Sequence, residues 1–170
     1  TYAVLTNSNN KNSLYDSYIK AFRWSTDRLD KQNGGIIAFI SNGAWLEVNT
    51  TSGFRKSLEN EFSSIWVFNL RGNQRTSGEL SRKEGGKIFG SGSRTPIAIT
   101  LLVKNPKSKA GKATIHYKDI GDYLSREEKL KIISKLQTVS NPAMLGILLS
   151  QMSTETGLIN EMKSIYRFFL

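Results

Sequence analysis

The stretch from Gly35 to Phe68, GIIAFISNGAWLEVNTTSGFRKSLENEFSSIWVF, decides the fold class. It starts with a continuous apolar run, Ile36 to Ile40, and ends with a second one, Ile65 to Phe68. Short apolar runs with β-branched members are typical of strands that are covered on both faces. From Phe54 to Phe62 the apolar residues repeat every four positions, which predicts an amphipathic helix. The stretch therefore predicts two strands of a parallel sheet, joined through a helix.

The residues on either side extend this alternation. Residues 13–31 place apolar side chains three and four positions apart, and the glycines after Asn33 should end the helix that this spacing predicts. Residues 96–103 and 113–117 predict two more strands. Their short connection favours an antiparallel pair at one end of the sheet. The predicted fold is a doubly wound α/β sheet with helices on each side.

The carboxyl-terminal part of the chain predicts helices. Ser125 and Glu128 have the spacing of a capping box, so we expect a helix that begins there and continues to about residue 138. Residues 141–170 are expected to add one or two further helices.

The composition excludes several classes of protein. The 170 residues include 24 Lys and Arg against 14 Asp and Glu, which gives a net charge of +10 and a pI of about 9.9. There is no cysteine and only one histidine, so we expect no disulfide, no cysteine chemistry and no metal site. No apolar run approaches the roughly 18 residues of a membrane span, and we expect a soluble, cytoplasmic protein with no membrane partner. Because the chain begins at Thr1, we expect it to be a segment of a longer polypeptide.

The positive charge is concentrated in residues 71–94, which we call the basic segment. It holds six glycines and six cations against two acids, and it lacks periodicity, so the sequence predicts a long loop. Lys and Arg that neutralise phosphates release counterions, which favours binding to nucleic acid. The alternative is a solvated surface loop. The predicted DNA-binding residues are Arg71, Asn73, Gln74, Arg75, Arg82, Lys83, Lys87 and Arg94.

Two aromatic residues allow a functional and a structural interpretation. Phe89 lies among polar residues and glycines, where it could stack on a base or anchor the loop against the sheet. Trp45 follows the first predicted strand, at the end where ligands bind in open α/β sheets, but packing against a helix is the favoured interpretation. No phosphate-binding glycine motif follows a strand, and His116 is more typical of a structural residue than of a catalytic one. The residues alone predict a basic α/β domain that binds nucleic acid, and no reaction.

Three blocks of the sequence resemble adenine-specific DNA methyltransferases. They are NSLYDSY at residues 12–18, GGIIAFISNGAWL at 34–46, and FSSIWVFNLRGNQRTSGELSRKEGGKIFGSGSRTPIAITLLVKNP at 62–106. Within that family the chain looks like the large single-polypeptide restriction-modification enzymes, which join a nuclease, a helicase-like ATPase, a methyltransferase and a target recognition domain and are often named simply as helicases. The likeness covers roughly residues 1–138.

The resemblance implies a class I, Rossmann-like methyltransferase fold. It further implies transfer of a methyl group from S-adenosylmethionine to the exocyclic amino group of an adenine that is flipped out of duplex DNA. Tyr18 occupies the position that flanks the adenine of the cofactor, and Phe89 occupies the position that stacks on the flipped base. The cations of the basic segment would then lie where the DNA backbone passes.

Two family motifs are absent from this sequence: the catalytic Asn-Pro-Pro-Tyr motif and the glycine-rich cofactor loop. Both precede the matching segment in the family. The resemblance therefore implies that residues 1–138 are the carboxyl half of a methyltransferase domain, with no catalytic residue, and that residues 139–170 are a helical extension or the start of a following domain. We expect that the isolated chain does not methylate DNA, which a tritium-transfer assay with labelled S-adenosylmethionine and duplex DNA would test.

Two other interpretations stay open at this point. The chain could be a non-catalytic DNA-binding or specificity module of a helicase-containing protein. It could also be a scaffold contact between motor and methyltransferase domains, with its charge serving solubility.

Overall fold

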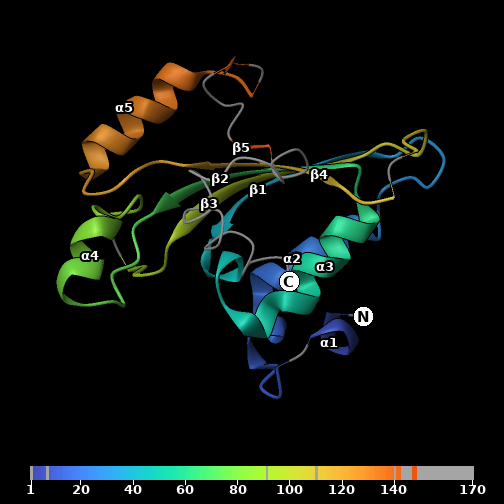
Figure 1. Cartoon of the computed structure of the whole chain (residues 1–170), viewed down its shortest axis with the longest axis horizontal. Helices are drawn as coiled ribbons and strands as arrows, with labels where there is room; N and C mark the ends of the chain where they lie inside the picture. Colours follow the sequence, from blue (N-terminus) through green and yellow to red (C-terminus); the bar gives the residue numbers. More distant parts are fainter. Residues whose placement is uncertain are drawn as a thin grey trace, which may run out of the picture.

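The computed structural model describes residues 2–6, 8–90, 92–109, 111–139, 141–142 and 147–148. The fold is mixed α/β, around a sheet with the strand order β1-β3-β2-β4-β5 (Figure 1). The strands are β1 (Gly35–Asn42), β2 (Ser64–Arg71), β3 (Ile97–Lys104), β4 (Thr114–Asp119) and β5 (Ile147–Leu148). The α-helices are α1 (Tyr2–Leu5), α2 (Ser17–Thr26), α3 (Ser52–Glu61), α4 (Gly78–Glu84) and α5 (Arg126–Leu136), and 3-10 helices occur at Asn12–Tyr15, Ala44–Leu46 and Asn49–Thr51.

The strand directions place three strand ends at one edge of the sheet. β3 is antiparallel to both of its neighbours, β1 and β2, and β4 is parallel to β2. β1, β2 and β4 therefore share one direction, and their carboxyl ends meet the start of β3. The pairing of Ile97 with both Asn42 and Arg71 marks this edge. We call it the carboxyl edge.

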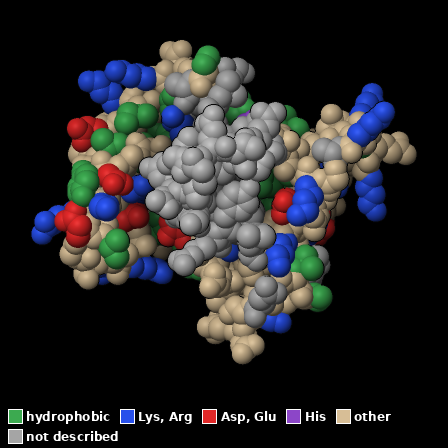
Figure 2. Space-filling view, in the orientation of Figure 1, with side chains coloured by type: hydrophobic (Ala, Val, Ile, Leu, Met, Phe, Trp, Pro, Cys, Tyr) green, Lys and Arg blue, Asp and Glu red, His purple; other side chains and the backbone are tan. Residues whose placement is uncertain are grey.

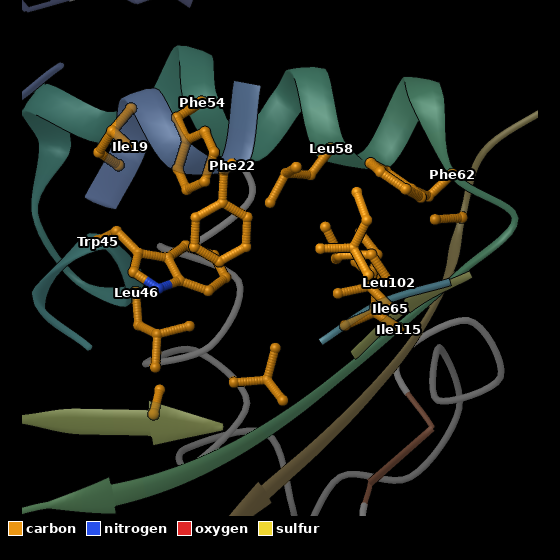
Figure 3. Packing of buried hydrophobic residues seen from close by; sticks show 14 of the residues in the cluster. Ile19, Phe22, Trp45, Leu46, Phe54, Leu58, Phe62, Ile65, Leu102 and Ile115 are labelled. Carbon is orange, nitrogen blue, oxygen red and sulfur yellow. The ribbon is translucent and has the colours of Figure 1, made fainter. Parts of the chain in front are cut away.

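The main core covers one face of the sheet. Helices α1, α2 and α3 lie on this face, whereas α5 lies on the other (Figure 1). Phe22 of α2 and Phe54 of α3 are fully buried and contact each other and Trp45, with ring centroids 5.3–6.2 Å apart (Figure 3). Trp45 is thus a packing residue, in agreement with the favoured interpretation of the sequence.

A second, smaller core cluster lies on the opposite face. Phe68 and Leu70 of β2 pack there with Ile97 of β3 and with Ile88 of the basic segment. Partly buried apolar residues of α5 cover this cluster. Helix α5 therefore fastens the basic segment to the sheet through apolar contacts. The predicted capping box at the start of α5 is confirmed, since Ser125 accepts from the main-chain N–H of Glu128 while the Glu128 carboxylate accepts from that of Ser125.

Arg55 of α3 is buried although the sequence places it on the polar side of the helix. Its guanidinium donates hydrogen bonds to the carbonyls of Trp45 (2.6 Å) and Val48 (2.9 Å) and to the hydroxyl of Thr51 (2.9 Å). Burial lowers the pKa of Arg55 to about 10. The side chain ties the turns that follow β1 to α3, which a helical periodicity cannot reveal.

The first predicted strand differs from the expectation in its surroundings. β1 pairs with β3 on one side and with no other strand among the described residues. Ile36 is 65% exposed and Ile40 is 62% exposed, because they point to the face that α2 and α3 leave uncovered. The prediction of a strand covered on both faces in a parallel sheet is therefore wrong for β1. The central strand β2 does have the predicted burial.

One prediction about strand pairing and one about secondary structure are also wrong. The strands at 96–103 and 113–117 exist as β3 and β4, but they are not paired, since β2 lies between them. Residues 147–148 form a short strand against β4 where the sequence predicts helix. The remaining tail, residues 149–170, lies outside the described residues.

Candidate nucleic-acid interface

The basic segment leaves the sheet at the end of β2 and returns at the start of β3, so both of its ends lie at the carboxyl edge. Ligands of open α/β sheets bind outside this edge. The segment is not the structureless loop that its composition predicts, because residues 78–84 form α4. Figure 1 shows α4 beyond the end of the sheet, next to the start of α5.

Arg71 fixes the first end of the segment. Its backbone has a positive φ of 55°, and its Nε donates to the carboxylate of Asp119 at 2.8 Å. A second nitrogen of the guanidinium donates to Asp122. Burial, the largest single effect, lowers the pKa of Arg71, but the hydrogen bond to Asp119 and the carboxylate charges of Asp119, Asp122 and Glu84 together raise it above its usual value. The guanidinium of Arg71 therefore joins β2 to β4, which leaves it less available to a phosphate than the other predicted cations.

Gln74 and Arg94 close the segment on itself. The main-chain N–H of Gln74 donates to the carbonyl of Arg94 (2.9 Å), and the Arg94 Nε donates back to the carbonyl of Gln74 (3.0 Å). The side-chain amide of Gln74 donates to the carbonyl of Gly85 (2.8 Å). The Asn73 N–H donates to the carboxylate of Glu84 (2.8 Å). Reading of an adenine edge by Asn73 and Gln74 stays a prediction, and the Gln74 amide would have to leave a bond to do it.

A buried lysine supports the middle of the segment. Lys129 of α5 is 0% exposed, and its ammonium donates to the carbonyls of Glu84 (2.7 Å) and Gly86 (2.9 Å). Arg126, one turn earlier, donates through Nε to the carbonyl of Ile88 (2.9 Å). Burial lowers the pKa of Lys129 to about 8. Lys129 was not predicted from the sequence. A signal is present, because Lys129 lies on the same helix face as Ile132, Ile133 and Leu136, the apolar residues of α5 that pack on the sheet.

The remaining predicted cations lie on the outside of this frame. Arg75, Arg82 and Arg94 are exposed, and Lys83 and Lys87 are half-buried. Figure 2 shows Lys and Arg side chains at the left of the molecule around α4 and α5, with Asp and Glu side chains among them, and again at the far right around the turn between β3 and β4. The structure therefore brings the predicted cations other than Arg71 together on the outer surface of one folded unit.

Phe89 and its neighbour Ile88 point in opposite directions. Ile88 is 7% exposed within the second core cluster, whereas Phe89 is 50% exposed. Ile88 anchors the segment against the sheet, and base stacking by Phe89 stays a prediction. The ring of Phe89 is accessible beside the cations of the segment.

A hollow of about 740 Å³ opens between α4 and the turn that follows it. Its lining combines two cations with hydroxyl, amide and glycine groups and contains no acid. The lining residues are Gln74, Ser77, Gly78, Ser81, Arg82, Gly85, Gly86 and Lys87.

Tyr18, the predicted cofactor contact, does not share this site. It lies on α2, partly buried against the main core on the other side of the sheet from α5 (Figure 1). Burial raises the pKa of its hydroxyl, and the nearby Asp16 carboxylate raises it further. His116 stacks on Trp66 with ring centroids 3.7 Å apart, as a structural residue would.

Two general searches of the described part of the chain gave negative results. No helix there is long and apolar enough to cross a membrane. No three His, Cys, Asp or Glu side chains in that part are grouped so that they could hold a metal ion.

The structure is similar to parts of solved restriction-modification enzymes. A nuclease-deletion mutant of the Type ISP restriction-modification enzyme LlaGI, in complex with a DNA substrate mimic, matches 83% of this chain with a TM-score of 0.77 and 47% identity. The ATP-dependent Type ISP restriction-modification enzyme LlaBIII, bound to DNA, matches 84% with a TM-score of 0.78 and 36% identity. A DrdV–DNA complex matches 77% with a TM-score of 0.70 and 34% identity.

These matches are confined to one segment of each relative. The chain spans 11% of the LlaGI chain, 9% of the LlaBIII chain and 12% of the DrdV chain. No protein-family model matches this sequence, and no curated protein is significantly similar to it.

Proposed function

Because this chain is homologous to one segment of Type ISP restriction-modification enzymes, we propose that it is part of the DNA adenine methyltransferase domain of such an enzyme. Its role is to bind duplex DNA through the basic segment and to stack Phe89 on the target base. The remaining domains of the parent polypeptide are its other partners. S-adenosylmethionine supplies the methyl group in the parent enzyme.

Tyr18 is the one residue of this chain that the family resemblance assigns to S-adenosylmethionine, and it packs partly buried against the main core. The hollow of the basic segment is lined by none of the residues of α2. We therefore assign no catalytic step to this chain, and the proposal concerns DNA alone.

The folded basic segment at the carboxyl edge is the observation that carries the proposal. Its main chain is held by Lys129 and Arg126, so its cations project from a fixed frame. Cations that are positioned before binding lose less conformational freedom when they meet phosphates. That LlaGI, LlaBIII and DrdV were all solved with DNA or a DNA mimic supports the same partner for this chain.

The exposed ring of Phe89 supports a contact with an unstacked base. An adenine amino group cannot be reached inside the duplex, so the base must be flipped out before it reacts. A flipped base needs an aromatic face, and stacking on an exposed side chain contributes roughly 1–3 kcal/mol. Phe89 is half-exposed and lies next to the anchored Ile88, which fixes its position.

Salt dependence tests the DNA contact. The Kd of this chain for a fluorescent duplex should rise with salt. The logarithm of the association constant K should fall against the logarithm of the salt concentration with a slope of about −0.9 for each phosphate that is contacted. Five outward cations predict several such contacts. A Kd that stays constant between low and high salt would remove the nucleic-acid proposal and favour the scaffold interpretation.

Phe89→Ala in the parent enzyme tests base stacking. We expect methylation to fall about 5- to 160-fold while the Kd for duplex DNA changes less than about twofold, since the loss of roughly 1–3 kcal/mol of stacking energy destabilises the flipped state. Leu80→Ala is a matched control, because Leu80 is a 64% exposed apolar residue of the same segment. Equal loss of methylation and binding would indicate a packing role, and unchanged methylation would favour a non-catalytic DNA-binding module.

A further inference from the structure

The hollow beside α4 has the chemistry of an anion site. Arg82 and Lys87 provide two positive charges at its wall, and Ser77 and Ser81 provide hydroxyl donors. A guanidinium offers paired N–H donors that match the oxygens of a phosphate. No acidic residue lines the hollow, so nothing at its surface repels an anion.

The two acids nearest in sequence already have partners. The carboxylate of Glu84 accepts from the N–H of Asn73 (2.8 Å). Glu79 accepts from the hydroxyl of Tyr123 and lies 3.4 Å from the Arg82 guanidinium, whose side chain is 76% exposed. An exposed pair at this distance is worth little, so Arg82 can turn to a stronger anion at small cost.

The floor of the hollow is rigid. Gly85 has a φ of +67°, and a Cβ placed there would lie 2.2 Å from the carbonyl oxygen of Leu124. A Cβ on Gly86 would lie 2.4 Å from the nitrogen of Arg126. The turn therefore rests directly on the main chain that leads into α5, and the N–H groups of Gly85 and Gly86 donate to the carbonyls of Arg82 (3.1 Å) and Leu124 (2.8 Å).

A buried positive charge lies beneath this floor. The ammonium of Lys129 donates a hydrogen bond to the carbonyl of Gly86, and Gly86 lines the hollow. Because Lys129 is 0% exposed, solvent screens its charge less than that of a surface lysine. Lys129 thus raises the potential of the hollow without occupying it.

We propose that this hollow binds a single phosphate group, held by Arg82 and Lys87 over the floor that Lys129 supports. The assignment to a phosphate of the DNA backbone rests on the proposed function, whereas the anion site itself does not. A free phosphate or a nucleotide phosphate has the same chemistry, so the test separates these sources.

The test is a titration of the whole chain with inorganic phosphate, followed by amide chemical shifts. We expect saturable shifts at Ser81, Gly85 and Gly86, and at least tenfold weaker binding in the double variant Arg82→Gln/Lys87→Gln. Both substituted side chains reach solvent, so the variant should remain folded. The matched control Lys107→Gln/Lys109→Gln removes the same charge from an exposed turn and should bind phosphate like the wild type.

Competition with duplex DNA then identifies the source. Displacement of inorganic phosphate by duplex DNA supports a backbone phosphate. Retained phosphate beside bound DNA supports a site for a free phosphate or nucleotide, and it keeps the anion site. A Kd for duplex DNA that does not change with salt, with phosphate still bound, would overturn the proposed function alone. Shifts spread evenly over all exposed cations, or none at the hollow, would overturn the phosphate site.

Discussion

The basic segment and the turn between β3 and β4 carry the same excess of positive charge in different structures. The turn, residues 104–112, has four lysines and no acid, and the basic segment has six cations and two acids, so each has an excess of four. They lie at opposite ends of the sheet, because β3 runs from the carboxyl edge to Lys104. We call residues 104–112 the lysine turn.

The two regions differ in how their main chain is held. In the basic segment, the buried Lys129 binds the carbonyls of Glu84 and Gly86, and the exposed Arg126 binds that of Ile88. In the described part of the lysine turn, the Asn105 N–H donates to the hydroxyl of Ser63 (3.1 Å) and the Lys107 N–H to the side chain of Asn105 (3.0 Å). Lys112 pairs with Glu59 at 3.3 Å while remaining 68% exposed. Equal net charge therefore gives a fixed surface in one case and solvated side chains in the other.

The comparison teaches that the frame, and not the charge, marks the candidate site. Flexible lysines must lose side-chain freedom on binding, whereas cations on a fixed frame lose less. Substitutions in the basic segment can therefore be matched by substitutions in the lysine turn.

The largest expected effect is on stability, from glycine substitution. Gly85→Ala places a Cβ 2.2 Å from a main-chain oxygen, at a positive φ that costs an L-residue about 1–2 kcal/mol. We expect the free energy of unfolding in urea to fall by about 2–4 kcal/mol. Gly111→Ala in the lysine turn meets nothing within 4 Å and should change it by less than about 0.5 kcal/mol. Equal effects would show that the basic segment is no better fixed than the lysine turn.

The next effect is on DNA binding. Arg75→Gln/Arg82→Gln removes two exposed cations of the basic segment, and we expect the Kd for duplex DNA to rise about tenfold. The slope of log K against log salt should become shallower by up to about 1.8, or 0.9 for each lost phosphate contact. Lys107→Gln/Lys109→Gln should change the Kd less than about threefold. Equal losses in fluorescence anisotropy would mean that charge alone directs binding.

The secondary structure of this chain could largely be predicted from its sequence. The apolar runs at 36–40 and 65–68 lie in β1 and β2, and the residues spaced by four from Phe54 lie in α3. Both could be predicted because local periodicity determines which residues can share a face. The strand order could not be predicted in the same way. Insertion of β3 between β1 and β2 depends on contacts distant in sequence, as does the absence, among the described residues, of a helix over the part of the sheet that exposes Ile36 and Ile40.

The composition of the chain predicted where the candidate site lies, but not how it is folded. The cations and glycines of residues 71–94 located it, and the exposure of Phe89 agrees with the residue that the family resemblance selects. Helix α4 was not predicted because its seven residues, which start with Gly78 and are followed by Gly85, are too few to show a helical periodicity. Lys129 was missed because a lysine in a helix is usually solvated, and its carbonyl partners lie 43 and 45 positions away.

A pH dependence separates Lys129 from the lysines of the turn. Burial lowers the pKa of Lys129 from 10.5 to about 8; Glu84 and Asp119 oppose this shift, and Arg71 adds to it. Between pH 8 and about 10.5 the unfolded chain holds a proton that the folded chain has released, so the free energy of unfolding should rise with pH in this window. Lys129→Met removes that rise, and it also lowers stability by about 2 kcal/mol at pH 7 because two buried carbonyls lose their donor. The difference between the free energies of unfolding of the wild type and of Lys129→Met cancels the tyrosines that titrate at higher pH, so it reports on Lys129. Lys131→Met controls for the loss of one exposed charge from α5. A difference curve that is flat from pH 7 to 10.5 would place the ammonium in water, and the basic segment would then lose the buried support that distinguishes it from the lysine turn.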